Sequence, residues 1–321
     1  MRAAYVATQS ADDPLAGLTV GDLDLPDAPV GFRRVRVVAS CLNHHDLWSL
    51  KGVGLSQDRL PMVLGCDAAG VDDDGNEVIV HGVVSSPKWR GDETLDPKRS
   101  LLSERHPGTM ADYVWVPERN LVPKPPELTF EEAACLPTAW LTAYRMLFTV
   151  SPAAPGATVL VQGAGGGVAS ALIALASAAG FRVWATSRSA QKRQRALELG
   201  ADQAFEDGAR LPERVDVVFD SVGEATWAHS LKSLVPGGTV VTCGATSGSA
   251  PSADLNRVFF LQLRVLGSTM GTREELVRLT RFLVATGVRP VIDTVLPLDD
   301  AARGFRRMLA GDVFGKIVFR H

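Results

Sequence analysis

The middle of the chain alternates short apolar runs with longer segments in which apolar residues recur at helical spacing. The alternation begins near residue 158 and continues to about residue 267. Strands that alternate with helices are typical of βαβ units built around a parallel sheet. The predicted strands are 158–161, 181–186, 215–219, 239–242 and 264–267, and the predicted helices are 168–179, 190–199 and 226–234.

The first third of the chain has a different pattern. Residues 33–42, 76–84 and 111–117 are short β-branched runs with partial alternation, separated by Gly, Pro and Asp. Such runs predict strands of a barrel or sandwich. Residues 85–108 are polar, charged and rich in turn residues, so we expect a long surface loop there.

A helix is predicted where these two patterns meet, over residues 128–148, because Thr129 and Glu132 form a capping box before apolar residues at helical spacing. The tail predicts helices over 273–286 and 301–309, with strand-like runs over 291–298 and 315–319. The whole pattern therefore predicts the α/β class, with a doubly wound domain inserted in a mostly β domain.

Composition narrows the class of protein. The chain has 321 residues, 46% of them hydrophobic and 21% charged, which favours a globular protein of two domains. A net charge of −3 does not favour nucleic acid as a partner. The N-terminus has no apolar signal region and no stretch is long enough to span a membrane, so a cytoplasmic protein is expected. None of the four cysteines lies in a Cys-x-x-Cys pair, which argues against a zinc lobe.

A glycine cluster follows the strand predicted at 158–161. Gly165, Gly166 and Gly167 form the turn, and a helix begins near Val168. The free N–H groups and the dipole at a helix N-terminus stabilise a pyrophosphate, and glycine permits its close approach. With a second strand about 20 residues further on, the pattern predicts a dinucleotide site rather than a plain turn.

The end of the second strand indicates which dinucleotide binds. Ser187 and Arg188 stand where an acidic residue would accept bonds from a ribose hydroxyl, and Lys192 and Arg193 follow one helical turn later. A guanidinium pairs bidentately with phosphate, so the sequence predicts NADPH/NADP rather than the unphosphorylated form. The alternative is that Arg188 is only a solvated loop charge.

In this order the segments resemble the medium-chain dehydrogenase/reductase superfamily, and within it the zinc-less quinone-oxidoreductase-like branch. The resemblance covers nearly the whole chain. It implies a GroES-like catalytic domain formed by residues 1–137 and 272–321, around a Rossmann cofactor domain at 138–271. The segments that carry it include "LNHHDLW", "LGCDAAG", "GTMADYVWVP", "VLVQGAGGGVAS", "FDSVG", "LVPGGTVVTCG" and "FGKIVF".

The resemblance also bears on metal binding. Zinc-dependent relatives place their ligands where this chain has Asn43, Cys66 and Thr138. One amide, one thiol and one hydroxyl make a poor zinc site, so we predict no metal. The alternative is an unusual site drawn from Cys41, His44, His45, Cys66 and Asp67.

Further cofactor contacts are implied by the resemblance alone. Thr142 is expected near the nicotinamide, and Lys316 in "FGKIVF" near the pyrophosphate. The remaining expected contacts follow two later strands: Gly244, Ala245, Ser268, Thr269 and Met270.

The expected reaction is hydride transfer from NADPH to a quinone or an α,β-unsaturated carbonyl. Without a metal, hydrogen-bond donors must polarise the carbonyl, and Asn43 is the candidate donor. His45 is the candidate proton donor, and Asp46 orients its neighbours. Trp48 stands where several relatives carry a tyrosine, and it has no transferable proton. Trp48, Trp89 and Phe260 are the candidates for an apolar substrate pocket.

Two other functions stay open from the sequence. One is a zinc-type alcohol dehydrogenase with a non-standard site, and the other is a non-catalytic NADPH-binding sensor or structural protein. We also expect a homodimer, because "LQLRVLGSTM" ends the doubly wound sheet with an apolar strand whose edge invites pairing.

Overall fold

The computed structural model describes residues 1–24 and 28–321. The chain divides into two compact units, which are described separately below. One unit combines Met1–Leu141 with Met270–His321, and the other is Thr142–Thr269. The α/β class is confirmed, with a mostly β unit formed by both ends of the chain and a doubly wound unit formed by its middle. No helix in the described residues combines the length and the apolar character that a membrane crossing requires.

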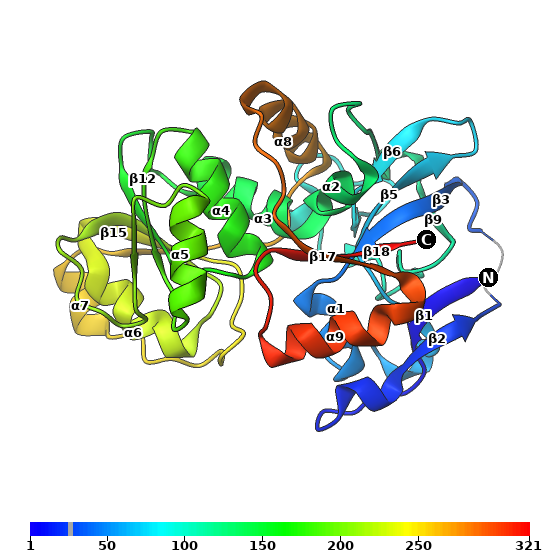
Figure 1. The fold of residues 1–321 in the computed structure, drawn as a ribbon, viewed down its shortest axis with the longest axis horizontal. Coiled ribbons are helices and arrows are strands. Elements are labelled where there is room, and N and C mark those ends of the chain that lie inside the picture. Colours follow the sequence, from blue (N-terminus) through cyan, green and yellow to red (C-terminus); the bar gives the residue numbers. More distant parts are fainter. Residues whose placement is uncertain (25–27) are drawn as a thin grey trace. The chain divides into compact units, whose positions relative to one another are not determined.

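The unit 142–269 contains a parallel sheet whose strands follow the order β13-β12-β11-β14-β15-β16. Helices follow the strands along the chain, as expected for βαβ units, and Figure 1 shows α4, α5 and α6 beside this sheet. The strands are β11 (Thr158–Val161), β12 (Arg182–Thr186), β13 (Gln203–Phe205), β14 (Val215–Asp220), β15 (Leu234–Thr242) and β16 (Arg264–Gly267). The helices are α3 (Leu141–Arg145, whose first residue belongs to the other unit), α4 (Gly167–Ala178), α5 (Ala190–Glu198), α6 (Glu224–Ser233) and α7 (Leu255–Phe260).

The strands of this sheet are nearly continuous apolar runs because helices cover both faces. Trp184 and Val218 are completely buried in a cluster of side chains from β11, β12, β14, β15 and α6. Three details differ from the sequence prediction, the first being that the short strand β13 was not predicted. Strand β15 begins at Leu234, five residues earlier than predicted, and the short helix α7 was not predicted.

The other unit holds a sheet with the path β10-β6-β5-β3-β18-β17, in which β9 also pairs with β3. Strand β18, at the C-terminus, pairs antiparallel with β3 and parallel with β17, so the two ends of the chain share one sheet. The main strands are β3 (Phe32–Cys41), β5 (Asp67–Asp72), β6 (Glu77–Val80), β9 (Tyr113–Pro117), β10 (Leu121–Pro123), β17 (Ile292–Pro297) and β18 (Lys316–Arg320). Smaller sheets join β1 (Arg2–Val6) with β2 (Leu18–Asp22) and β4 (Met62–Val63), and β7 (Val83–Val84) with β8 (Ser100–Leu101).

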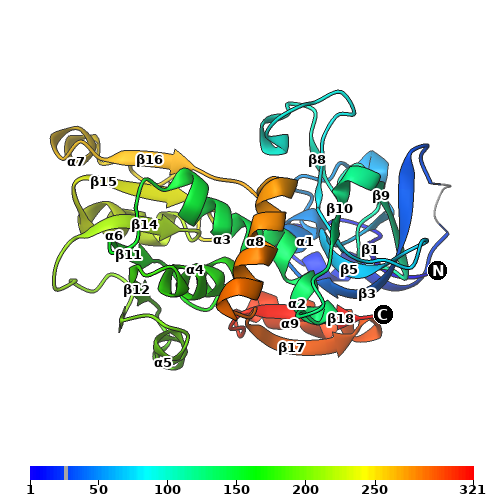
Figure 2. The same cartoon turned by 90° about the horizontal axis from the view of Figure 1, so that it is seen from above.

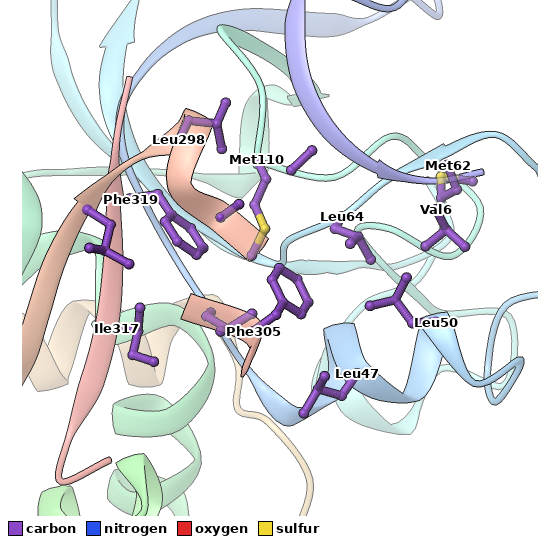
Figure 3. Close-up of a cluster of buried hydrophobic side chains, with 14 of the residues drawn as sticks. Val6, Leu47, Leu50, Met62, Leu64, Met110, Leu298, Phe305, Ile317 and Phe319 are labelled. Carbon is purple, nitrogen blue, oxygen red and sulfur yellow. The ribbon is translucent and has the colours of Figure 1, made fainter. Parts of the chain in front are cut away.

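Helices α1 (His44–Leu50), α2 (Phe130–Ala134), α8 (Arg273–Thr286) and α9 (Ala301–Ala310) belong to this unit. One hydrophobic cluster packs α1 and α9 against the N- and C-terminal strands, as Figure 3 shows for Leu47, Phe305 and Phe319. A Cβ at Gly304 would lie 2.9 Å from the Phe319 ring, so α9 needs glycine there to approach β18. Because burial of a phenylalanine contributes about 1.5–3 kcal/mol, this cluster fixes the ends of the chain against α1.

The helix predicted over 128–148 is a series of shorter helical turns. The capping box is confirmed, because Thr129 Oγ1 accepts from the N–H of Glu132 at the start of α2 (Phe130–Ala134). A π-helical turn follows over Leu136–Trp140 and a second over Met146–Val150. Pro137 lacks an N–H and cannot continue the α-helical hydrogen bonds, which explains the interruption.

Candidate functional site

The glycine turn lies between β11 and α4, as the sequence predicted. Gly165 has a φ of 126°, a conformation that L side chains rarely adopt. Gly166 is the N-cap of α4, and Gly167 and Val168 form its first turn. The first N–H groups of a helix have no acceptor within it, so this turn presents donors and a positive dipole end to an anion.

The loop after β12 and the start of α5 carry three residues that were predicted for this site. Ser187 is buried, whereas Arg188 is exposed and its guanidinium has no side-chain partner among the described residues. A Cβ at Gly165 would lie 2.8 Å from Lys192 Cδ, so the Lys192 side chain passes directly over the glycine turn. Positive side chains and free N–H groups therefore gather at one edge of the sheet.

The sequence placed Arg193 one turn after this loop but did not predict that it holds the loop in place. Arg193 Nη1 donates to the carbonyl oxygen of Ser187 at 2.7 Å and to that of Arg188 at 3.3 Å. The loop is thus fixed from the following helix while the Arg188 side chain stays free. The sequence shows an arginine in the first turn of the helix, but only the fold shows that its guanidinium points back to the loop.

A buried polar network beneath the turn was also missed. Asp220, at the end of β14, accepts from Thr226 Oγ1 at 2.8 Å, from Ser230 Oγ at 2.7 Å and from two backbone N–H groups. Gln162 Nε2 donates to Ser230 Oγ at 3.1 Å, and Thr186 Oγ1 donates to Gln162 Oε1 at 2.6 Å. The network joins the ends of β11, β12 and β14, so it makes the edge that carries the turn rigid.

The other predicted cofactor residues lie at the carboxyl ends of the later strands or near them. Gly244 and Ala245 follow β15, and a Cβ at Gly223 would lie 2.8 Å from Ala245 Cα. Ser268 N donates to the carbonyl oxygen of Thr242 at 2.8 Å, and Thr269 follows it. In open parallel sheets ligands bind outside the carboxyl ends of the strands, where these residues are found. Two residues stand apart from this group: Thr142 is buried at the start of this unit, and Met270 begins the other unit's second segment.

The first catalytic candidates lie at the start of α1. Asn43 is the N-cap, and its N–H donates to Asp46 Oδ2 at 2.8 Å. The other oxygen of Asp46 accepts from Gly65 N at 2.9 Å. Burial raises the pKa of the Asp46 carboxyl to about 6. Asp46 therefore ties α1 to the turn before β5.

A buried charged cluster lies directly behind Asn43, and it includes a residue that was predicted elsewhere. Lys316 Nζ donates to Asn43 Oδ1 at 2.5 Å and to the carbonyl oxygen of Leu42 at 2.9 Å, and it lies 3.5 Å from Asp67 Oδ2. Asn43 Nδ2 donates to the same Asp67 oxygen at 2.7 Å, and Thr138 Oγ1 donates to Asp67 Oδ1 at 2.5 Å. We call Lys316, Asp67, Asn43 and Thr138 the lysine cluster.

This arrangement changes two expectations. The Lys316 side chain is 3% exposed and bound to groups of its own unit, so it is not extended toward a pyrophosphate. The amide of Asn43 is engaged on both its oxygen and its nitrogen, so it is not free to polarise a substrate carbonyl. Sequence spacing gave no sign of either, because these residues come from four separate segments.

His45 and Trp48 lie on α1 with less engaged side chains. Nε2 of His45 is buried and has no hydrogen-bond partner among the described residues. Trp48 is 36% exposed, and the Lys51 ammonium lies 5.1 Å from its ring centroid. His45 thus retains a free ring nitrogen, which an acid or base requires.

The residues at the family's metal positions do not fit a zinc ion. Cys66 Sγ donates to the carbonyl oxygen of Leu102 at 3.1 Å, and burial raises the pKa of its thiol well above the usual value. Zinc binds the thiolate form, whereas this environment favours the thiol. The side-chain oxygen of Asn43 already accepts a hydrogen bond from the Lys316 ammonium. The part of the chain that the structure describes also holds no group of three His, Cys, Asp or Glu side chains close enough to bind a metal together.

The three aromatic residues predicted to line a pocket belong to different units: Trp48 and Trp89 lie in the unit of the chain ends, and Phe260 lies in the unit 142–269. Phe260 is 79% exposed on α7, and Trp89 lies in the 85–108 loop with its Nε1 donating to Asp92 O at 2.8 Å. A cavity of about 570 Å³ in the unit of the chain ends, beside β9 and that loop, contains none of the three.

Comparisons with known proteins agree with the two units. The alcohol dehydrogenase GroES-like domain family matches residues 33–126, and the zinc-binding dehydrogenase family matches residues 167–285. A 2-methylene-furan-3-one reductase from Solanum lycopersicum is 33% identical, over 92% of this chain and 73% of the relative.

Two solved structures extend the comparison. An NAD-dependent alcohol dehydrogenase is 36% identical, with a TM-score of 0.93 over 100% of both chains. The 2-octenoyl-CoA carboxylase reductase CinF, in complex with NADP and 2-octenoyl-CoA, is 26% identical, with a TM-score of 0.88 over 99% of this chain and 87% of that one. The predicted GroES-like and Rossmann architecture is thereby confirmed. With its fold, its glycine turn and these matches taken together, the chain is an oxidoreductase that belongs to the medium-chain dehydrogenase/reductase superfamily.

Proposed function

We propose that this protein uses NADPH to reduce a quinone or an α,β-unsaturated carbonyl, without a bound metal. The observation that supports this cofactor most is the exposed guanidinium of Arg188, which has no side-chain partner among the described residues and follows β12, the strand paired with the one that leads into the glycine turn. A guanidinium there would pair with the 2′-phosphate that distinguishes NADPH from NADH. Lys192, which passes over Gly165, adds a second positive charge at the same place.

NADPH, when bound, supplies the hydride. The N–H groups of Gly167 and Val168 would hold its pyrophosphate, since they begin a 12-residue helix. Ser187 and Arg188 would hold the ribose phosphate. The rigid network around Asp220 would keep the strand ends that carry these groups at a fixed spacing.

The substrate class is supported by the chemistry of two relatives. The furanone reductase and the carboxylase reductase are named for substrates in which a carbon–carbon double bond is conjugated to a carbonyl. Hydride transfer to such a system places negative charge on the carbonyl oxygen, which donors must stabilise. His45, whose buried Nε2 has no partner among the described residues, is our candidate to supply the proton. Asp46 and Asn43 would position α1 rather than react.

A second candidate function is NAD-dependent oxidation of an alcohol. The observation that favours it is the structure of an NAD-dependent alcohol dehydrogenase that is 36% identical over the whole chain. The two candidates differ in the cofactor that binds tightly, so binding separates them before any substrate is known.

Fluorescence titration with NADPH and with NADH is the first test. We expect NADPH to bind more tightly, and Arg188→Gln to weaken NADPH binding by about 10- to 100-fold while leaving NADH unchanged, since a charge-assisted pair contributes about 1.5–3 kcal/mol. Arg214→Gln is the matched control. Arg214 is also exposed, but it precedes β14 and so lies at the amino ends of the parallel strands, away from the carboxyl ends that carry the glycine turn. Tighter binding of NADH by the wild type would contradict the proposed cofactor.

Turnover is the second test. NADPH oxidation would be followed with 1,4-benzoquinone, 3-buten-2-one and trans-2-hexenal, and NAD⁺ reduction with a panel of primary alcohols. We expect NADPH oxidation with at least one quinone or enone. Tight NADPH binding without any turnover would instead favour the non-catalytic alternative, and turnover of alcohols alone would favour the dehydrogenase.

We also propose that the protein is a homodimer paired through β16. This strand is the outer strand of its sheet, as Figure 2 shows, and Val265 on it is 46% exposed. On α7, Leu255, Phe259 and Phe260 are 70%, 67% and 79% exposed. A sheet edge with apolar side chains beside it is suited to pairing with a second copy. Sedimentation equilibrium should give a dimer, and Val265→Asp combined with Phe259→Ser should give a monomer.

A further inference from the structure

Two of the residues at the positions of the relatives' zinc ligands, Asn43 and Thr138, belong to the lysine cluster in this chain. The cluster therefore suggests what replaces the metal here. We propose that Lys316 is a positioning residue whose ammonium takes the electrostatic place of a metal ion, and that it fixes the Thr138 hydroxyl through Asp67. This inference rests on the proposed function for its kinetic test but not for its metal test. The proposal is built from contacts within one unit of the chain.

The first argument is charge compensation. Asp67 is completely buried, and an uncompensated buried carboxylate costs several kcal/mol. Lys316 is the cation that lies within ion-pair distance of Asp67 among the described residues. The ammonium therefore compensates the Asp67 carboxylate from within the same buried cluster.

The second argument is that the ammonium occupies the oxygen atoms a metal would use. Asn43 Oδ1 lies 2.5 Å from Nζ, and Asp67 Oδ2 lies 3.5 Å from it. A divalent ion on the same oxygens would lie within a few ångströms of this ammonium, and like charges that close in a buried site repel strongly. The same pair of oxygens cannot serve both cations.

The third argument is the path from Lys316 to the surface of the cluster. Lys316 and Asn43 both hold Asp67 Oδ2, which leaves Oδ1 to accept from Thr138 Oγ1 at 2.5 Å. Lys316, Asp67 and Asn43 are buried, whereas Thr138 is partly exposed. Because its proton points to Asp67, the Thr138 oxygen presents lone pairs outward. A ligand would meet an acceptor there, oriented from behind by a fixed positive charge.

The metal test uses the purified wild type. After incubation with zinc sulfate and gel filtration, we expect less than about 0.1 zinc ion per chain, and 1,10-phenanthroline should leave the rate unchanged, since the donor set suits zinc poorly. One zinc ion per chain would overturn the inference. The zinc content, unlike the rate with 1,10-phenanthroline, is measured without a substrate, so this part of the test stands even if no quinone or enone is reduced and the proposed function fails.

The kinetic test compares charge variants with NADPH and the most active substrate among 1,4-benzoquinone, 3-buten-2-one and trans-2-hexenal. Lys316→Met combined with Asp67→Asn removes both charges and so avoids an uncompensated carboxylate. We expect this double variant to fold and to bind NADPH within about threefold of wild type, but to lose about 100-fold in kcat, as a misplaced group would cause. Lys316→Arg, which keeps the cation, should stay within about tenfold of wild type.

Thr138→Val shows whether Lys316 acts through the hydroxyl. We expect the single variant to lose about as much kcat as the Lys316/Asp67 double variant, and the triple variant to lose no more than either, because groups that act as one unit are not additive. Losses that multiply, or a double variant with wild-type kcat, would overturn the inference.

Lys124→Met is the matched control for burying and removing a lysine. The Lys124 side chain is 4% exposed and its Nζ lies 2.9 Å from Glu77 Oε2, in the same unit. This variant should lose stability while its kcat stays within about twofold of wild type. An equal loss of kcat would mean that any buried lysine matters, and the assignment of Lys316 would fail.

Discussion

The lysine cluster and the loop around Arg188 both gather positive charge near residues expected at the site, yet they are built in opposite ways. Every polar group of the lysine cluster is bonded to another group of the same unit, and its ammonium is 3% exposed. The guanidinium of Arg188 is exposed and has no side-chain partner in the described part of the chain. A group already bonded within the protein positions its neighbours, whereas an unbonded group at the end of a strand is available to a ligand.

The sharpest test of this comparison is the stability cost at each place. Lys316→Met should lower the free energy of unfolding by about 3–5 kcal/mol, because it leaves the Asp67 carboxylate buried without its cation. Urea denaturation followed by circular dichroism measures this loss. A loss below about 1 kcal/mol would show that Asp67 is compensated in another way.

A pH dependence of stability provides the next test, and it concerns Asp46, which is held beside the lysine cluster. The pKa of its carboxyl is about 6 in the folded protein and about 4 when unfolded. Between pH 4 and pH 6 the Asp46 carboxyl is ionised in the unfolded chain but still protonated in the folded protein. The free energy of unfolding therefore falls by about 3 kcal/mol from pH 4 to pH 7. Asp46→Asn should remove this contribution. Equal pH slopes for wild type and variant, in urea denaturation at four pH values, would contradict it.

A smaller effect is expected at the glycine turn. Gly165→Ala should lower the free energy of unfolding by about 1–2 kcal/mol, since the φ of 126° strains any side chain and the Cβ would meet Lys192. It should also weaken NADPH binding. Gly166→Ala is the matched control for stability, because nothing lies within 4 Å of its Cβ position. If both variants unfold alike, the strain at Gly165 is not what makes glycine necessary.

The smallest effect on stability should come from Arg188 itself. Arg188→Gln should change the free energy of unfolding by less than about 0.5 kcal/mol, as exposed positions without partners usually do. The same variant is expected to weaken NADPH binding, so the two measurements separate. A loss of several kcal/mol in stability would mean that the guanidinium has a structural partner and that the comparison fails.

Sequence patterns predicted the parallel sheet well because each of its elements is determined locally. Apolar runs such as 159–161 and 217–219 are buried on both faces, and turn residues bound their strands. The helix over 128–148 was less predictable, since Pro137 changes the hydrogen-bond pattern without changing the apolar spacing. The start of β15 was missed because Gly237 and Gly238 resemble a turn although they lie within the strand.

The sequence by itself determined the two-part α/β architecture, the glycine turn and the arginine after the second strand of the sheet, because each depends on neighbours within a few residues. Only the tertiary structure decided what Asn43 and Lys316 do. Their partners come from β3, β5, α1 and β18, which are separated by up to 274 residues along the chain. A hydrogen bond depends on distances of about 3 Å, and no periodicity in the sequence fixes such a distance between segments so far apart.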